Sequence, residues 1–230
     1  MNIITNDNLT IEVIKTKRRK TISIKIANGS ARIIAPEKIS NFRLEEIIKD
    51  RTVWIRKKLE KSKLIISKPK KYINGEVFSY LGHDYKLKIL PGIKSHVKIN
   101  DGFIEVSSSK RFQKDSVKNV LVEWYKDKAI EVLVEKTNKF AEIIGVQPNA
   151  ITVRYYKSRW GQCSSIGKIS YNWRIMIAPD HIVDYVVVHE LCHLLELNHS
   201  KNYWNHVLSN YPDYKECHNW LKANGHTLIL

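Results

Sequence analysis

The sequence predicts an α+β fold with a strand-rich first half and a helix-rich second half. In the first half, apolar and polar residues alternate between turn dipeptides such as Asn28-Gly29 and Asp101-Gly102, which is typical of β-hairpins. From residue 116 onward, apolar residues recur every three or four positions, which is typical of amphipathic helices. The change places a boundary near residue 110. We therefore expect a β-rich N-terminal region with one helix over 1–110 and a second domain over 111–230.

The first half contains signals for two pairs of strands and one helix. The stretch "KTISIKIANGSARIIAP" (20–36) predicts a hairpin that turns at Asn28-Gly29. Ser40 or Asn41 can cap a helix over 42–64, whose apolar residues have helical spacing. Pro69 and Asn74-Gly75 interrupt the pattern, and strands are predicted over 77–90 and 96–106.

The second half begins with a long helix predicted over 116–144, which Gly145 ends. Two strands follow, "AITVRYY" (150–156) and "KISYNWRIMIAP" (168–179), joined by the loop "KSRWGQCSSIG". Asp180 is the expected N-cap of a helix that runs to residue 197. Shorter helices are predicted from Ser200 and from Asp213, the last ending near Gly225.

Charge and cysteine content limit the possible binding partners and cellular location of the protein. Of 230 residues, 39 are Lys or Arg and 23 are Asp or Glu, a net charge of +16, and 29 of the basic residues are Lys. Such a surface can attract nucleic acid without reading its sequence. The basic run over 15–20 could be such a contact, but we interpret it as a solvated lead-in to the first hairpin. No secretory signal and no membrane-spanning apolar run are visible, and three cysteines do not suggest a disulfide framework. We therefore expect a cytoplasmic protein with no membrane partner.

The stretch "VVVHELCHLLELNHS" (186–200) carries the strongest functional signal. In a helix, His189 and His193 lie on one face, one turn apart, so that both imidazoles can bind one Zn²⁺. Glu190 lies beside them and can accept a proton from water at the metal. This is the chemistry of the H-E-x-x-H motif, which arises by chance roughly 0.02 times in a chain of this composition.

A catalytic zinc needs a third protein ligand and one open position. Glu196 follows on the same helical stripe, but three ligands along one helix cannot surround a metal. We expect Asn198 to end the helix in the left-handed conformation, so that His199 folds back as the third ligand. Glu216, in a downstream helix, is the rival. The sequence thus predicts one Zn²⁺ per chain.

The whole chain resembles the YgjP-like metallopeptidase family, which is related to SprT-type and WLM-type zinc proteases. The similarity rests on "SRWGQCSS", "GKISYNWRIMIAP", "VVVHELCHLLELNHS" and "YWNHVLSNYPDYKECHNWLKANG", together with "KRRKTISIKI", "GSARIIAP" and "YLGHDYKL" nearer the N-terminus. The resemblance implies zinc at His189, His193 and His199, with Glu190 as general base. It also implies a zincin-like fold in which a strand near 168–177 borders the cleft.

Other residues near the motif have weaker signals. We interpret Cys192 and Cys163 as structural thiols, and His181 and His218 as surface or capping residues. Arg159 and Trp160 can shape the cleft, and Tyr203 or His206 can stabilise an oxyanion. The strand over 168–177 is expected to be a sheet edge that a peptide substrate extends.

We conclude from the sequence that the chain is a zinc-dependent metallopeptidase acting on a peptide or protein. Two alternatives stay open. One is a metal-dependent nucleoside triphosphate pyrophosphatase, an activity associated with some members of the family, although no Gly-rich phosphate loop is visible. The other is a non-enzymatic nucleic-acid-binding module with structural zinc, although such a site prefers four protein ligands and needs no adjacent base.

Overall fold

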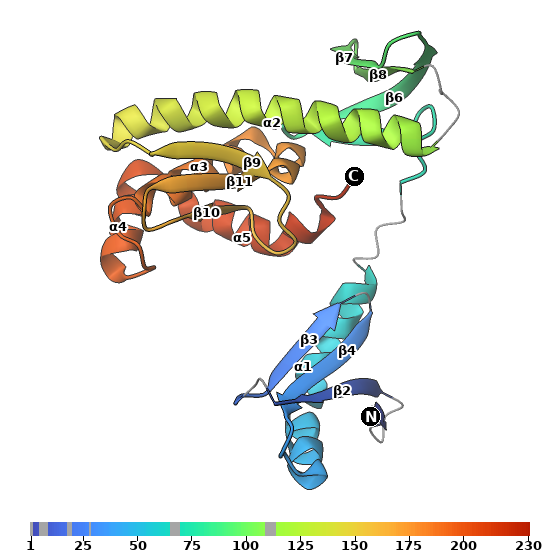
Figure 1. Cartoon of the computed structure of the whole chain (residues 1–230), viewed down its shortest axis with the longest axis vertical. Coiled ribbons are helices and arrows are strands. Elements are labelled where there is room, and N and C mark those ends of the chain that lie inside the picture. The colour runs from blue at the N-terminus through green and yellow to red at the C-terminus, as the bar shows by residue number, and fades with distance from the viewer. Residues whose placement is uncertain (1, 5–8, 18–19, 28, 65–69, 109–113) are drawn as a thin grey trace. The chain divides into compact units, whose positions relative to one another are not determined.

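The computed structural model describes residues 2–4, 9–17, 20–27, 29–64, 70–108 and 114–230 (Figure 1). The chain divides into two units, Met1–Pro69 and Lys70–Leu230, each of which is described by itself. The predicted boundary near residue 110 falls inside the second unit, and residues 109–113 lie outside the described part of the chain. Arg18 and Arg19 of the basic run are also outside it.

The first unit is a four-stranded sheet packed on one helix. Its strands are β1 (Asn2–Ile4), β2 (Thr10–Thr16), β3 (Ser23–Ala27) and β4 (Ser30–Pro36), in the order β1-β2-β4-β3, followed by α1 (Asn41–Leu64). The β3–β4 hairpin is confirmed, with Ile24 opposite Ile33 and Gly29 at φ 71°. Ser40 Oγ accepts a hydrogen bond from Arg43 N–H at 3.2 Å, which confirms the predicted cap. The apolar faces of the sheet and the helix form one core.

The second unit begins with a sheet of the same topology. Its strands are β5 (Val77–Tyr80), β6 (His83–Pro91), β7 (His96–Asn100) and β8 (Phe103–Ser108), in the order β5-β6-β8-β7. As in the first sheet, the two central strands are parallel and the outer strands are antiparallel to them. The predicted turn is confirmed, with Asp101 at φ 45° and Gly102 at φ 77°.

The helix α2 (Lys114–Ile144) links this sheet to the rest of the second unit. It ends at Gly145, which has φ 75°, as predicted. Leu121 and Tyr125 of α2 are fully buried in one core with Ile104 of β8 and with Val187 of the buried helix α3 (Asp180–Cys192). The sheet β5–β8 therefore shares its core with the helices that follow it, although residues 77–108 were expected in the N-terminal region.

A three-stranded sheet lies along α2 (Figure 1). It consists of β9 (Ala150–Arg154), β10 (Gly161–Cys163) and β11 (Lys168–Asn172), in the order β10-β11-β9. The prediction of a sheet edge at 168–177 is wrong, because β11 pairs with a strand on both sides and a 3₁₀ helix, η1 (Trp173–Ile177), follows it. The edge strand on the side of α3 is β10, in the stretch predicted as a loop.

Helix α3 differs at both ends from the prediction. Pro179 holds the N-cap position, while the Asp180 carboxylate accepts a hydrogen bond from Lys136 Nζ at 3.0 Å. The helix ends at Cys192 and not at residue 197. Asn198 is not left-handed either, since the described non-glycine residues with positive φ are Tyr72, Leu81 and Asp101.

The last helices are α4 (Lys201–Asn210) and α5 (Tyr214–Asn224), followed by the 3₁₀ helix η2 (Gly225–Thr227). Both begin where the sequence predicts, and α5 ends next to Gly225 as predicted. Ser200 Oγ caps α4 by accepting a hydrogen bond from Tyr203 N–H at 3.2 Å. Among the described residues, no helix combines the length and hydropathy needed to span a membrane.

Candidate metal centre

Three histidine side chains converge where α3 ends. One ring nitrogen from each of His189, His193 and His199 lies within 4.8 Å of the other two. The Nε2 atoms of His189 and His199 are 3.3 Å apart. Tetrahedral ligands at Zn–N distances of about 2.0–2.1 Å stand roughly 3.3–3.4 Å apart, so this pair has the spacing that zinc requires. Over the described residues the cluster contains these three side chains and does not include Glu216.

A tight turn after α3 brings His199 to the other two histidines. Leu194 N–H donates to the carbonyl of Leu191 at 2.9 Å, and Glu196 N–H donates to the carbonyl of Cys192 at 3.1 Å. His193 Nδ1 lies 3.1 Å from the Glu196 carbonyl oxygen. A proton on Nδ1 satisfies this carbonyl and leaves the Nε2 lone pair of His193 available to a metal.

Tyr203 of α4 contacts the histidine cluster. Its ring stacks on His193 with centroids 4.5 Å apart, and its hydroxyl donates to the backbone carbonyl of His189 at 2.9 Å. Because Tyr203 is fully buried and its one hydroxyl proton is engaged, it is a support and not an oxyanion donor in this structure. His206, the other predicted oxyanion donor, makes no hydrogen bond or ring contact with the three histidines in the described chain.

The environment keeps the three imidazoles neutral near pH 7. Burial, reinforced by His193 and His199, lowers the pKa of His189 to about 3. Burial also lowers the pKa of His193 and of His199. The neutral ring is the form that binds a metal, so little protonation competes with binding.

His218 of α5 is nearer to the centre than the sequence indicated. It is exposed, as predicted for a surface residue, yet its charge contributes to the lowered pKa of both His189 and His199. Its Nδ1 lies 3.3 Å from the hydroxyl of Tyr185, whose ring contacts that of His189 at 5.8 Å. No sequence signal marked this arrangement, because α3 and α5 meet only in the folded chain.

The Glu190 carboxyl is buried between α3 and β10, with 5% of the residue exposed. Burial raises its pKa to about 8, while the Arg159 guanidinium and a hydrogen bond from Cys163 N–H act to lower it. A Cβ atom on Gly161 would lie 2.5 Å from Glu190 Cγ and 2.6 Å from Cδ. The absence of a side chain at Gly161 therefore lets the carboxyl lie against the backbone of β10. A cation held by the neighbouring histidines would favour its ionised form.

The cysteines do not take part in the cluster. Cys192 is fully buried, and burial raises the pKa of its thiol to about 11. Burial also raises the pKa of the half-buried Cys163 thiol to about 11, and none of Cys163, Cys192 and Cys217 forms a disulfide. Protonated thiols at neutral pH fit the structural roles predicted for Cys163 and Cys192.

A model of the YgjP-like metallopeptidase domain matches residues 20–224. The chain belongs to the YgjP-like metallopeptidase family. The resemblance predicted from the sequence motifs is thus confirmed, and the match extends over parts of both units.

A solved structure, the metallopeptidase zymogen abylysin of Pyrococcus abyssi, is similar to part of the chain. The match has 22% identity and a TM-score of 0.35, and covers 38% of this chain and 89% of that one. No curated protein sequence matches the chain. Membership in the YgjP-like family therefore rests on the family model.

Proposed function

We propose that the protein is a zinc-dependent peptidase with a zincin-like catalytic domain and one zinc ion per chain. The observation that carries this proposal is the convergence of three histidine nitrogens at the end of α3, in which the buried Glu190 directly follows His189. Structural zinc sites take four protein ligands, whereas catalytic sites take three and leave a position open. The donor set of His189, His193 and His199 is of the second kind.

Glu190 would act as the general base and then as the general acid. When bound, zinc supplies Lewis acidity, which polarises a peptide carbonyl and makes water a stronger nucleophile near neutral pH. The Glu190 carboxylate takes the proton that the attacking water loses and delivers it to the nitrogen of the leaving amine. The contact of Glu190 with β10 at Gly161 positions the carboxylate for both transfers.

The edge strand β10 is the part of the sheet that we propose binds the substrate backbone. One side of β10 pairs with β11, and no strand of the described chain pairs with its other side. An extended peptide added there gains main-chain hydrogen bonds and passes Gly161, against which Glu190 lies. This role replaces the one that we predicted for 168–177.

Removal and return of the metal tests the proposed function. The full chain is treated with a zinc chelator, dialysed and assayed on a randomised peptide library, with cleavage read by mass spectrometry. We expect cleavage before treatment, loss after it and recovery on adding one equivalent of zinc, because the neutral histidine cluster supplies the ligands. Cleavage that survives complete zinc removal, or a zinc-loaded protein that cleaves no library peptide, would overturn the proposal.

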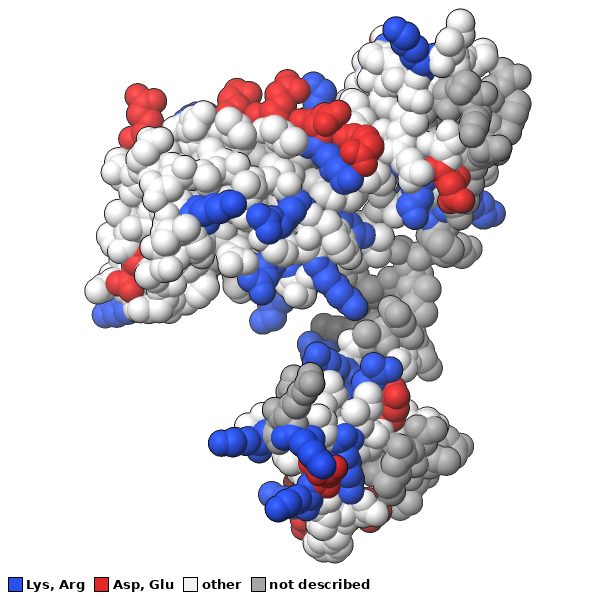
Figure 2. Space-filling model, viewed as in Figure 1, with Lys and Arg blue, Asp and Glu red and all other residues white. Residues whose placement is uncertain are grey.

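For the first unit, we propose sequence-independent binding of nucleic acid. Its 69 residues contain 17 Lys and Arg against 7 Asp and Glu, a net +10 of the chain's +16. On the face that Figure 2 shows, its charged side chains are mostly Lys and Arg. Most of its basic residues are Lys, which neutralise phosphates without reading bases. Such binding would bring the peptidase to proteins on nucleic acid.

A salt titration of the full chain on unrelated DNA duplexes tests this proposal. Exchanging the exposed Lys49, Lys57 and Lys58 of α1 for Gln should lower the log–log salt slope by up to about 2.7, or about 0.9 for each lost phosphate contact. Exchanging three lysines of the second unit (Lys118, Lys139 and Lys222) for Gln should leave the slope nearly unchanged. Salt-insensitive binding, or a slope that responds only to the second set, would contradict it.

We also propose that the protein is cytoplasmic. Its three cysteines are unpaired, and Cys192 and Cys217 are buried as thiols, which suits a reducing compartment. Recovery of the full chain with the secreted or membrane fraction of its cells would contradict this location.

A further inference from the structure

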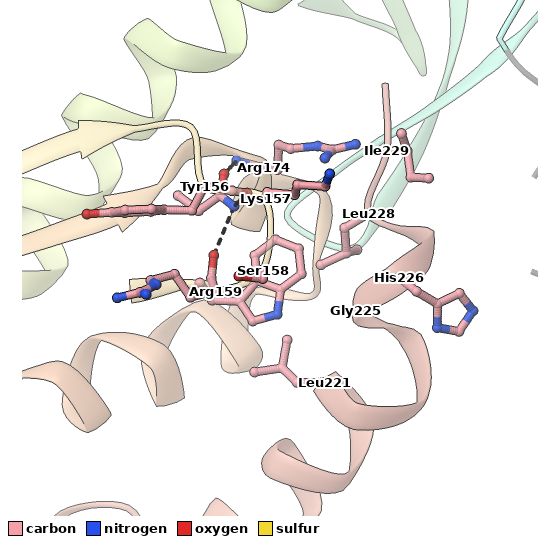
Figure 3. Close-up of a pocket in the computed structure, with 12 residues that line it drawn as sticks. Tyr156, Lys157, Ser158, Arg159, Arg174, Leu221, Gly225, His226, Leu228 and Ile229 are labelled. Atoms are coloured by element: carbon pink, nitrogen blue, oxygen red, sulfur yellow. Dashed lines mark hydrogen bonds between the residues drawn. The ribbon is translucent and has the colours of Figure 1, made fainter. Parts of the chain in front are cut away.

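A cavity of about 390 Å³ lies at the N-terminal end of β10 (Figure 3). Its floor is the loop that leads into β10, and its far wall is the end of α5 with the segment after it. Asn172, which is buried, fixes this loop by donating from Nδ2 to the carbonyls of Tyr156 at 2.8 Å and Arg159 at 3.0 Å. The loop is therefore held in one conformation before any ligand arrives.

The cavity is lined by cationic side chains and by no Asp or Glu. Lys157 and Arg174 extend to the same side of the loop, toward Leu228 and Ile229, whereas Arg159 extends the opposite way (Figure 3). Arg174 is half-buried, and its guanidinium lies 5.6 Å from the centre of the Tyr155 ring. In the described chain, neither Lys157 nor Arg174 forms an ion pair with a carboxylate.

A half-buried guanidinium without an anion has lost part of its hydration and gained no opposite charge. Burial accordingly lowers the pKa of Arg174. The planar guanidinium matches the two oxygens of a carboxylate, and the adjacent ammonium adds a second charge. Most of the acidic side chains visible on the second unit lie over α2 (Figure 2). The chemistry of the cavity is thus that of a site for an anion supplied from outside.

The cavity lies close to the place where the scissile peptide bond would bind. Trp160 lines the cavity, and the next residue, Gly161, packs against Glu190. A substrate that runs antiparallel to β10 has its C-terminal part at the N-terminal end of the strand. At about 3.3–3.4 Å per residue, its second or third residue after the scissile bond reaches the cavity.

The opposite end of β10 offers different chemistry. Beyond Cys163, a cavity of about 430 Å³ is lined by His193, by apolar side chains that include Ile166 and Leu194, and by the uncharged polar side chains of Gln147, Asn149 and Ser164. An antiparallel substrate would place there the residues that precede the scissile bond. The two ends of β10 therefore distinguish the two directions of a bound peptide.

We propose that the cavity at Lys157 and Arg174 binds a substrate carboxylate that follows the scissile bond, either an acidic side chain or a free C-terminus. This specificity rests on the proposed peptidase function. It selects peptides with an acidic group two or three residues after the cut.

Cleavage of a randomised peptide library by the zinc-loaded full chain tests the preference. We expect Asp or Glu to exceed Gln about ten- to a hundredfold in kcat/KM at the second or third position after the cut. A matched pair with a free and an amidated C-terminus separates the two sources of the carboxylate. Equal cleavage of acidic, Gln and Lys peptides, or an acidic preference before the cut, would overturn the proposal.

Reversing the charge at Lys157 tests whether the preference for acidic peptides arises from this cavity. Lys157→Glu, at an exposed residue, should shift the preference from acidic toward Lys peptides, and Arg174→Gln should weaken it at an unchanged unfolding temperature. Lys222→Glu, on α5 outside the cavity, is the matched control and should change nothing. A preference that ignores Lys157→Glu but follows the control would also overturn the assignment.

A binding measurement separates the failure of this proposal from failure of the peptidase function. Fluorescently labelled acidic and neutral peptides are titrated into the metal-free full chain and followed by anisotropy. Tighter binding of the acidic peptide that Lys157→Glu abolishes supports the cavity even if no peptide is cleaved. Equal binding of both peptides, or displacement of the acidic peptide by a nucleotide but not by unlabelled acidic peptide, contradicts it.

Discussion

The substitution Gly161→Ala should disable the proposed base without touching a metal ligand. The added Cβ would lie 2.5 Å from Glu190 Cγ and 2.6 Å from Cδ, whereas ordinary contacts begin at 3.4 Å. The carboxyl must therefore move by roughly 1 Å, because the backbone of β10 is paired with β11. A displacement of this size lowers the rate of a positioned reaction about a hundredfold. We expect that loss in kcat.

Metal content and peptide cleavage are measured together on Gly161→Ala and on the control Gln162→Ala. Gln162 is exposed on the same strand and accepts a hydrogen bond from Arg159. Both variants should hold as much zinc as the parent, and only Gly161→Ala should lose activity. A fully active Gly161→Ala protein would refute the placement of Glu190 against β10. Loss of zinc in Gly161→Ala would instead show that β10 supports the ligands.

Two further sets of variants test the rest of the centre. Elemental analysis should show zinc loss in each of three variants, His189→Ala, His193→Ala and His199→Ala. Glu216→Ala should retain its zinc, because among the described residues only the three histidines converge. Zinc loss in Glu216→Ala together with full zinc content in His199→Ala would show that Glu216 is the third ligand. Tyr203→Phe should keep its ring stacking but lose the hydrogen bond to the His189 carbonyl, which should weaken zinc affinity about ten- to a hundredfold in a chelator competition. Unchanged affinity in Tyr203→Phe would show that the hydrogen bond does not position His189.

Features set by local sequence were predictable. The turns at Gly29 and Asp101-Gly102, the cap at Ser40 and the end of α2 at Gly145 depend on a few adjacent residues, and the structure has each of them. The family resemblance was also readable, because its motifs are contiguous. The packing of the sheets β5–β8 and β9–β11 against α2 was not, since it depends on which apolar faces meet.

The end of α3 shows that tertiary packing can end a helix although the helical periodicity of the sequence continues. Leu194, Leu195 and Leu197 continue the helical periodicity, so the sequence favoured a helix to residue 197. The chain instead turns after Cys192, which brings His199 within 3.3 Å of His189. Strand β10 was missed for a related reason. Three residues contain too little alternation to predict a strand, and β10 forms because β11 pairs with it.

Glu190→Gln provides the most direct test of the peptidase function. The substituted glutamine would keep the shape of the side chain beside the cluster, but an amide cannot accept and return a proton. We expect the zinc content and the unfolding temperature of the variant to match those of the parent, and peptide cleavage to fall at least about 10²–10⁴-fold. Cleavage at the parental rate by a zinc-loaded Glu190→Gln protein would contradict the account.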